Sequence, residues 1–112
     1  MRTLSRLSSR EQEVLYKFKR LVCEEFSGTK LIVFGSRARG DADSESDMDV
    51  LVLLQQQVTA KIKHIIRDDA WEAGFANGII INTLIVSASH WQKGPFRHSL
   101  LEKAVVLEGI TI

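Results

Sequence analysis

The sequence has little cysteine, no long apolar run and almost no net charge, and each of these features excludes a class of protein. Its single cysteine, Cys23, cannot form an internal disulfide framework. No apolar run of membrane length and no N-terminal signal-peptide core occur, which predicts a cytoplasmic protein with no membrane partner. The formal net charge of +1 gives no global signal for binding a polyanion. The length of 112 residues and the hydrophobic content of 45% predict a single domain over residues 1–112.

What the sequence does contain is one unusual stretch, residues 31–54. An apolar block at its start has the composition of a buried strand and ends in Gly35 and Ser36. Gly35 permits backbone angles and close approaches that a Cβ would block, and Ser36 can cap a short turn or helix. Free backbone N–H groups at such a start can bind an anion, and Arg37 and Arg39 add positive charge suited to phosphate. This end of the stretch therefore predicts a phosphate site.

The other end of the stretch is a pair of carboxylates. Asp47 and Asp49 are separated by one residue at the start of a second apolar run. Residues i and i+2 of a strand point to the same side, where two carboxylates repel each other unless a cation lies between them. Hard oxygen ligands suit Mg²⁺, which proteins hold through one or two carboxylates together with phosphate oxygens and water. The two ends together predict a magnesium-bound nucleoside triphosphate and transfer at a phosphorus centre.

Other motifs at this place fail on their residue types. The two glycines have P-loop spacing, but Asp41 and Ala42 stand where Lys and Ser or Thr are required. A calcium loop counted from Asp41 has Ser and Val where it needs Gly and Glu. Ser36 lacks the G-x-S-x-G pattern of a hydrolase nucleophile. The remaining alternative, an ordinary turn beside a solvated acidic loop, explains each half alone but not their joint spacing.

These residues resemble a known family. Gly35-Ser36, ten residues, and then Asp47-x-Asp49 resembles the signature of the polymerase-β-type nucleotidyltransferase superfamily, and GSRARGDADSESDMDVLVL is similar to its minimal nucleotidyltransferases. The resemblance implies that Asp47 and Asp49 are catalytic ligands of Mg²⁺. It also implies that Gly35 and Ser36 hold the terminal phosphates of ATP or another NTP and that Arg39 neutralises them. Many minimal members are encoded beside HEPN-domain partners as toxin–antitoxin pairs, which implies AMP transfer to a hydroxyl of such a partner.

The sequence departs from this family at one position. Catalytically complete members carry a third carboxylate on a later strand, whereas the β-like run over 79–87 offers only Asn82 and Thr83. Asn82 can give a metal a neutral oxygen but can supply neither charge nor a base. Asn82 is thus either a site residue or a polar residue of a strand edge. Two functions follow: a nucleotidyltransferase, or a catalytically impaired module that neutralises its partner by binding.

The remaining segments predict the scaffold. Ser8 and Glu11 form a capping box for a helix within 1–28, Thr59 begins a helix within 55–78, and Pro95 suits the first turn of a third helix. The first helix has a basic side without interleaved aromatic residues, so direct nucleic-acid binding is not expected. Short polar residues over 41–46 predict a loop. Strands are expected over 30–35, 48–54, 79–86 and 105–108. This order predicts an α/β (α+β) fold, and the resemblance implies a nucleotidyltransferase fold with a mixed β-sheet of about four to five strands packed against three helices.

Overall fold

A mixed β-sheet is the frame of the molecule. The computed structural model describes residues 6–40 and 47–112, so the loop predicted over 41–46 lies outside the described residues. The sheet has the strand order β3-β2-β1-β4. Strand β1 is antiparallel to both β2 and β4, whereas β2 and β3 are parallel. The strands are β1 Lys30–Phe34, β2 Met48–Leu54, β3 Ile81–Ser87 and β4 Ile110–Thr111. The predicted mixed sheet is therefore confirmed.

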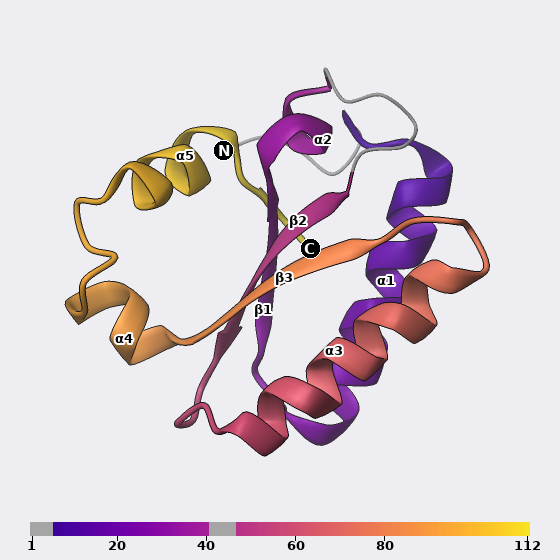
Figure 1. Ribbon diagram of the computed structural model, residues 1–112. Coiled ribbons are helices and arrows are strands. Elements are labelled where there is room, and N and C mark those ends of the chain that lie inside the picture. The colour runs from indigo at the N-terminus through magenta and orange to yellow at the C-terminus, as the bar shows by residue number, and fades with distance from the viewer. Residues whose placement is uncertain (1–5, 41–46) are drawn as a thin grey trace.

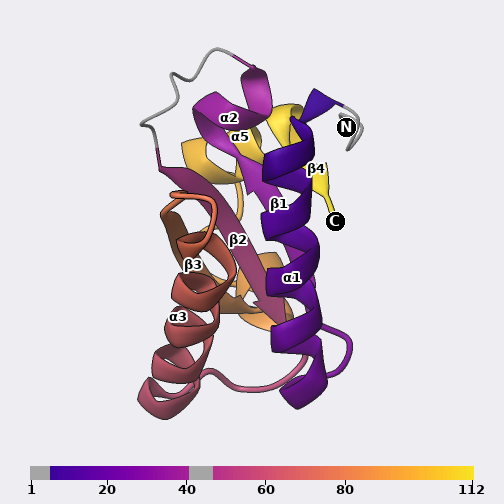
Figure 2. The same ribbon diagram turned by 90° about the vertical axis from the view of Figure 1, so that its right-hand side faces the viewer.

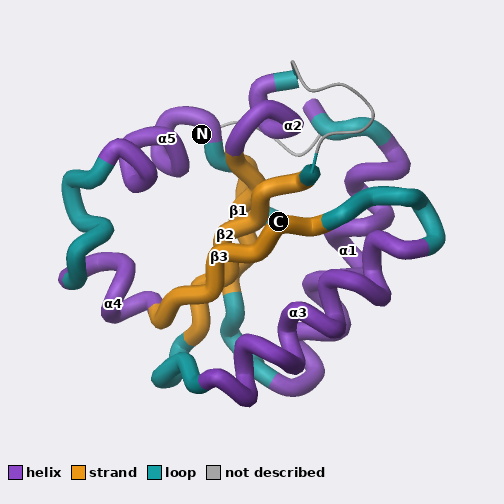
Figure 3. Tube along the Cα trace, in the orientation of Figure 1, coloured by secondary structure: helices purple, strands orange, loops and turns teal. Residues whose placement is uncertain are grey.

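Helices cover both faces of this sheet (Figure 1). The two long helices α1 and α3 contact each other on one face, and α4 and α5 lie on the opposite face (Figure 2). The short helix α2 follows β1 directly at one end of the sheet (Figure 3). The helices are α1 Ser9–Glu25, α2 Gly35–Arg39, α3 Ala60–Phe75, α4 Ala88–Lys93 and α5 Leu100–Glu108, so α2 and α4 are additional to the three expected. None of the helices in the described ranges is long and apolar enough to cross a membrane.

Hydroxyl side chains begin the main helices. The Ser8 hydroxyl accepts a hydrogen bond from the Glu11 N–H, and the Glu11 carboxylate accepts one from the Ser8 N–H, which confirms the predicted capping box. The Thr59 hydroxyl caps α3 in the same way, as predicted. Ser87 and Ser99 cap α4 and α5. Each cap satisfies a backbone N–H that has no partner within its helix.

The C-terminal segment differs from the prediction. A helix was expected from Pro95 and a strand over 105–108, but α5 starts at Leu100 and continues through this apolar run. The Ser99 hydroxyl accepts the Glu102 N–H and thereby places the helix start after the proline. The β-branched run favours a strand by local propensity, but packing of Val105 against the sheet outweighs that preference. The last strand, β4, follows the helix and pairs with β1.

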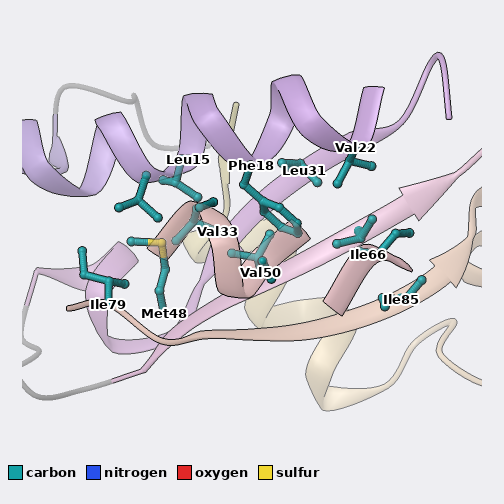
Figure 4. Packing of buried hydrophobic residues seen from close by; sticks show 14 of the residues in the cluster. Leu15, Phe18, Val22, Leu31, Val33, Met48, Val50, Ile66, Ile79 and Ile85 are labelled. Carbon is teal, nitrogen blue, oxygen red and sulfur yellow. The ribbon is translucent and has the colours of Figure 1, made fainter. Parts of the chain in front are cut away.

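The apolar core determines which face each residue of β2 occupies. Met48 and Val50 point into the larger cluster, which fills the space between the sheet and helices α1 and α3 (Figure 4). Leu51 and Leu53 belong to a second cluster beneath α4 and α5. Because successive strand residues alternate between faces, Asp49 lies on the α4–α5 face of the sheet.

Candidate functional site

The strand pairing brings the two predicted halves of the site together. Strands β1 and β2 are antiparallel, so the end of β1 lies beside the start of β2, and Phe34 is paired with Asp49. Gly35 therefore follows β1 at the position where the carboxylates begin. Strands β2 and β3 are parallel, and their register places Asn82 on the other side of Asp49. Three segments far apart in the sequence thus meet at one end of the sheet.

Gly35 is in direct proximity to one of the two carboxylates. Its φ is +78°, in the left-handed region that glycine adopts at little cost. A Cβ at this position would collide with Oδ2 of Asp49 and would lie only 3.4 Å from its Cγ. A side chain at position 35 would therefore force the Asp49 carboxylate to move. The Asp49 carboxylate thus lies against the glycine bend, and this contact requires that residue 35 has no side chain.

Asp47 and Asp49 lie on one side of β2. Met48 between them is fully buried in the larger core cluster, so its two neighbours point to the opposite face. Asp47 is exposed and Asp49 is half-buried. Neither carboxylate has an ion-pair partner within residues 6–40 and 47–112. Two carboxylates without an ion-pair partner in these ranges form a donor set that fits Mg²⁺.

Asn82 contacts one of the two carboxylates, Asp49, directly. Its Nδ2 donates a hydrogen bond of 3.0 Å to Oδ1 of Asp49. The donor must be the amide nitrogen, because an ionised carboxylate only accepts hydrogen bonds. One oxygen of Asp49 is thus held by Asn82, while the other faces Gly35. Of the two interpretations left open by the sequence, this geometry favours Asn82 as a residue of the site.

The third carboxylate of the family pattern has no counterpart in the described part of the chain. Within residues 6–40 and 47–112, no group of three His, Cys, Asp or Glu side chains is placed to share a metal ion. On β3, the residue beside Asp49 is the amide Asn82. The described part of this end of the sheet therefore holds two carboxylates and one neutral amide.

Arg37 does not serve the phosphate site. Its side chain is 5% exposed and its Nη1 lies 2.9 Å from Oε2 of Glu11 on α1. Burial alone would raise the pKa of Glu11, but hydrogen bonds from the Ser8 N–H and from Arg37 outweigh this effect and lower the pKa below its usual value. The expectation that Arg37 adds charge for phosphate was wrong, because this arginine fixes α2 to α1. The sequence marked Glu11 only as a helix cap, and no local signal connected it with Arg37.

Arg39 and Ser36 lie on α2 beside the bend. The Arg39 side chain is 41% exposed, and its Nη1 lies 3.1 Å from Oε2 of Glu108 at the end of α5. The predicted contact of Arg39 with phosphate stays a prediction. Ser36 does not cap α2 as expected, because Phe34 occupies the cap position and makes no side-chain cap. The Ser36 hydroxyl forms no hydrogen bond with a described residue.

Comparison with known proteins agrees with this geometry. Residues 15–104 match the family model described as a nucleotidyltransferase domain. Two curated relatives come from Methanocaldococcus jannaschii. "Putative protein adenylyltransferase MJ0141" is 43% identical over 56 residues, which are 50% of this chain and 57% of that protein. "Putative protein adenylyltransferase MJ1379" is 36% identical over 52 residues, 46% of this chain and 48% of that protein. The matches thus span about half the length of each relative.

A solved structure shares the fold. It is described as the crystal structure of a toxin–antitoxin with AMP-PNP and superposes with a TM-score of 0.58. The sequence identity is 18%, and the match covers 86% of this chain and 69% of the other. Since the family model spans most of the chain and the strand order brings its two signature segments together, the chain belongs to the nucleotidyltransferase domain family.

Proposed function

We propose that this domain transfers a nucleotidyl group, AMP, from a magnesium-bound ATP to a hydroxyl group. The observation that carries the proposal is the contact between the glycine bend and Asp49, the second acid of the pair. Oδ2 of Asp49 lies where a Cβ of residue 35 would be, and alternation about the buried Met48 places Asp47 on the same side as Asp49. A triphosphate at the bend would reach carboxylates that lack a cationic partner in the described ranges. The names of the two curated relatives support adenylyl as the transferred group.

Each residue of the site has a distinct role in this proposal. Asp47 and Asp49 hold Mg²⁺, which when bound neutralises charge on the triphosphate. Gly35 admits the phosphates, and the Ser36 hydroxyl donates a hydrogen bond to them. Arg39 leaves Glu108 and binds a phosphate oxygen instead, because a guanidinium can bind either a carboxylate or a phosphate. Asn82 keeps the Asp49 carboxylate in one orientation.

The acceptor in this proposal is a hydroxyl on a HEPN-type protein, and the domain acts as the antitoxin of that partner. The similarity of fold to a structure described as a toxin–antitoxin supports a partner protein. The domain would present the nucleotide at the end of its sheet, and the partner would supply the attacking oxygen. One P–O bond forms at the α-phosphorus, the bond to the leaving pyrophosphate breaks, and the proton of the hydroxyl passes to water.

The test is transfer of label from α-labelled ATP. Purified domain, Mg²⁺ and a HEPN partner should give a labelled partner, and Asp47→Asn or Asp49→Asn should reduce the rate by at least about 100-fold. Asp68→Asn is the matched control, because Asp68 is an exposed acid on α3 outside the site. Labelling that survives both site substitutions, or no labelling of any tested partner, would contradict the proposal.

A second candidate function has its own support in Asn82. Because an amide stands beside Asp49 on β3, the site has two acids instead of three among the described residues. Such a domain can bind a nucleotide and cover its partner without turnover. The double variant Asp47→Asn, Asp49→Asn separates the two functions. If it still neutralises the partner, binding alone accounts for the activity.

A further inference from the structure

The free edge of β3 has no role in the proposed transfer reaction. In the described part of the chain β3 is the outermost strand of the sheet, paired only with β2. Figure 2 shows it at the left margin of the sheet, with α3 in front. An edge strand presents unpaired N–H and C=O groups that another extended chain can bind.

The register determines which backbone groups face outward. The Met48 N–H donates to the Ile80 carbonyl at 2.8 Å, so this carbonyl points toward β2. Backbone groups of a strand alternate in direction from one residue to the next. The even-numbered residues of β3 therefore direct their N–H and C=O groups to β2. The odd-numbered residues, including Thr83 and Ile85, direct theirs to the free edge.

A groove of about 400 Å³ accompanies this edge. Residues 84–87 of β3 form its floor. Val58 and Lys63 line it from the α3 side, and His90 and Phe96 line it from the α4 side. The two walls come from opposite faces of the sheet, because α3 and α4 cover opposite faces (Figure 1). The groove thus follows the edge strand between the two helical layers.

The two walls differ in chemistry. Lys63 has no ion-pair partner within residues 6–40 and 47–112, so its ammonium group is available to an anion. On the other wall, Phe96 packs edge-to-face against His90 with ring centroids 5.9 Å apart, and this surface suits an apolar side chain. An added strand would direct alternate side chains to the two walls. The groove would then select an added strand in which acidic and apolar residues alternate.

We propose that this groove binds an extended segment of a partner protein as a fifth strand, with acidic side chains toward Lys63 and apolar side chains toward Phe96. The outward groups of Thr83 and Ile85 would form the backbone hydrogen bonds. A second copy of this chain fits less well, because β3 contains no acid and pairing of two edges would bring two Lys63 side chains together. The groove runs along residues 84–87, toward the end of β3 opposite Asn82 and Asp49.

The first test uses a fluorescein-labelled peptide of sequence VEVEVEV as the probe. Fluorescence anisotropy should show saturable binding, and Lys63→Glu should weaken it by roughly three- to tenfold, the range of one exposed ion pair reversed in sign. The peptide VKVKVKV should instead bind Lys63→Glu more tightly than it binds the unchanged protein. Lys61→Glu is the matched control, because Lys61 is exposed on the same helix and does not line the groove. Equal affinity of both peptides for the unchanged protein and for Lys63→Glu would overturn the proposal.

The second test reports on the backbone directly. On peptide binding, amide hydrogen exchange should slow at Thr83 and Ile85 and stay unchanged at Leu84 and Val86, which already face β2. A peptide N-methylated on the edge that faces the protein should lose binding, and one methylated on the opposite edge should retain it. No change at Thr83 and Ile85 with saturating peptide would exclude strand addition. Protection of these amides that rises with protein concentration alone would instead show that a second copy occupies the edge.

Discussion

Gly35 is the residue on which the site depends most directly. It combines a positive φ with a carboxylate where its Cβ would be. Gly78 shares the positive φ, at +64°, but a Cβ there would meet no atom within 4 Å. The two glycines therefore separate the cost of the backbone angle from the cost of the blocked carboxylate.

Gly35→Ala and Gly78→Ala should both lower the free energy of unfolding, by roughly 1 kcal/mol from the backbone angle alone. Only Gly35→Ala should also displace Asp49 and reduce the affinity for Mg²⁺ with AMP-PNP, by at least about tenfold. Thermal unfolding measures the first effect and isothermal titration calorimetry the second. Equal nucleotide affinity in the two variants would mean that position 35 does not face the ligand.

Asn82 gives a test of the metal site that does not depend on turnover. Asn82→Asp places a third carboxylate beside Asp49, which should lower the unfolding temperature without metal because like charges repel. Added Mg²⁺ or Mn²⁺ should then raise that temperature more in the variant than in the unchanged protein.

Asn77→Asp, which adds the same charge in the turn before β3, is the control for this comparison and should not gain in metal response. A metal response of Asn82→Asp no larger than that of the control would place Asn82 outside the reach of the cation. Asn82→Ala removes the hydrogen bond without adding charge and isolates its contribution to stability, roughly 0.5–1 kcal/mol because the bond is exposed to solvent.

The two arginines of helix α2 differ in burial and in their ion-pair partners. Arg37 is buried against Glu11 of α1, whereas Arg39 is partly exposed beside Glu108 of α5. Arg37→Met should destabilise the fold by roughly 3 kcal/mol, because Glu11 would keep a buried charge without its partner. Arg39→Met should change stability by less than about 1 kcal/mol and should weaken nucleotide binding.

Chemical denaturation and nucleotide titration on the same two variants check this division of roles. If Arg39→Met leaves the nucleotide affinity unchanged, Arg39 does not bind phosphate. If Arg37→Met proves as stable as the unchanged protein, the ion pair with Glu11 does not hold α2 in place.

The packing of α1 against α3 predicts a dependence of stability on pH. Burial, and next the charges of Glu25, Glu72, Asp68 and Glu24, raise the pKa of Asp69 to about 6. A carboxyl whose pKa is higher in the folded state than the ordinary 3.8 favours folding in its protonated form. The Asp69 contribution should therefore be present below about pH 4 and should be lost as the pH rises through about 6.

Asp69→Asn should keep the neutral form at every pH and should stabilise the protein above pH 7, by about 1 kcal/mol after allowance for solvent screening. Urea unfolding from pH 4 to pH 8 measures this as a difference between variant and unchanged protein that grows with pH. Glu13→Gln, an exposed change on α1, should show no such trend. A constant difference across the range would contradict the raised pKa.

At the scale of the whole molecule, local signals predicted most of the frame. Ser8 and Thr59 mark helix starts through hydrogen bonds within a few residues, and such contacts are encoded locally. The alternation in β2 likewise places Asp47 and Asp49 on one side of the strand. The family pattern predicts which end of the sheet carries the site, and the register of β1 and β2 brings its two segments together there.

Contacts between distant segments could not be predicted in this way. The run 105–107 has strand-like residues, and only the cap at Ser99 and the packing of Val105 make it helical. Glu11 and Arg37 are 26 positions apart, and Arg39 and Glu108 are 69 apart. No periodicity or motif carries such pairings, because they depend on where complete elements dock.

The ion pair between Arg39 and Glu108 has a consequence for how ligands would communicate. If a triphosphate binds the Arg39 guanidinium, the ion pair that connects α2 to Glu108 of α5 breaks. A partner protein that reorients α5 would break the same ion pair and leave the guanidinium able to bind phosphate. Nucleotide binding at Arg39 would then change the affinity of α5 for the partner protein, and partner binding would change the nucleotide affinity by the same factor. Nucleotide and partner would behave as mutual effectors, with a single arginine as the exchange point.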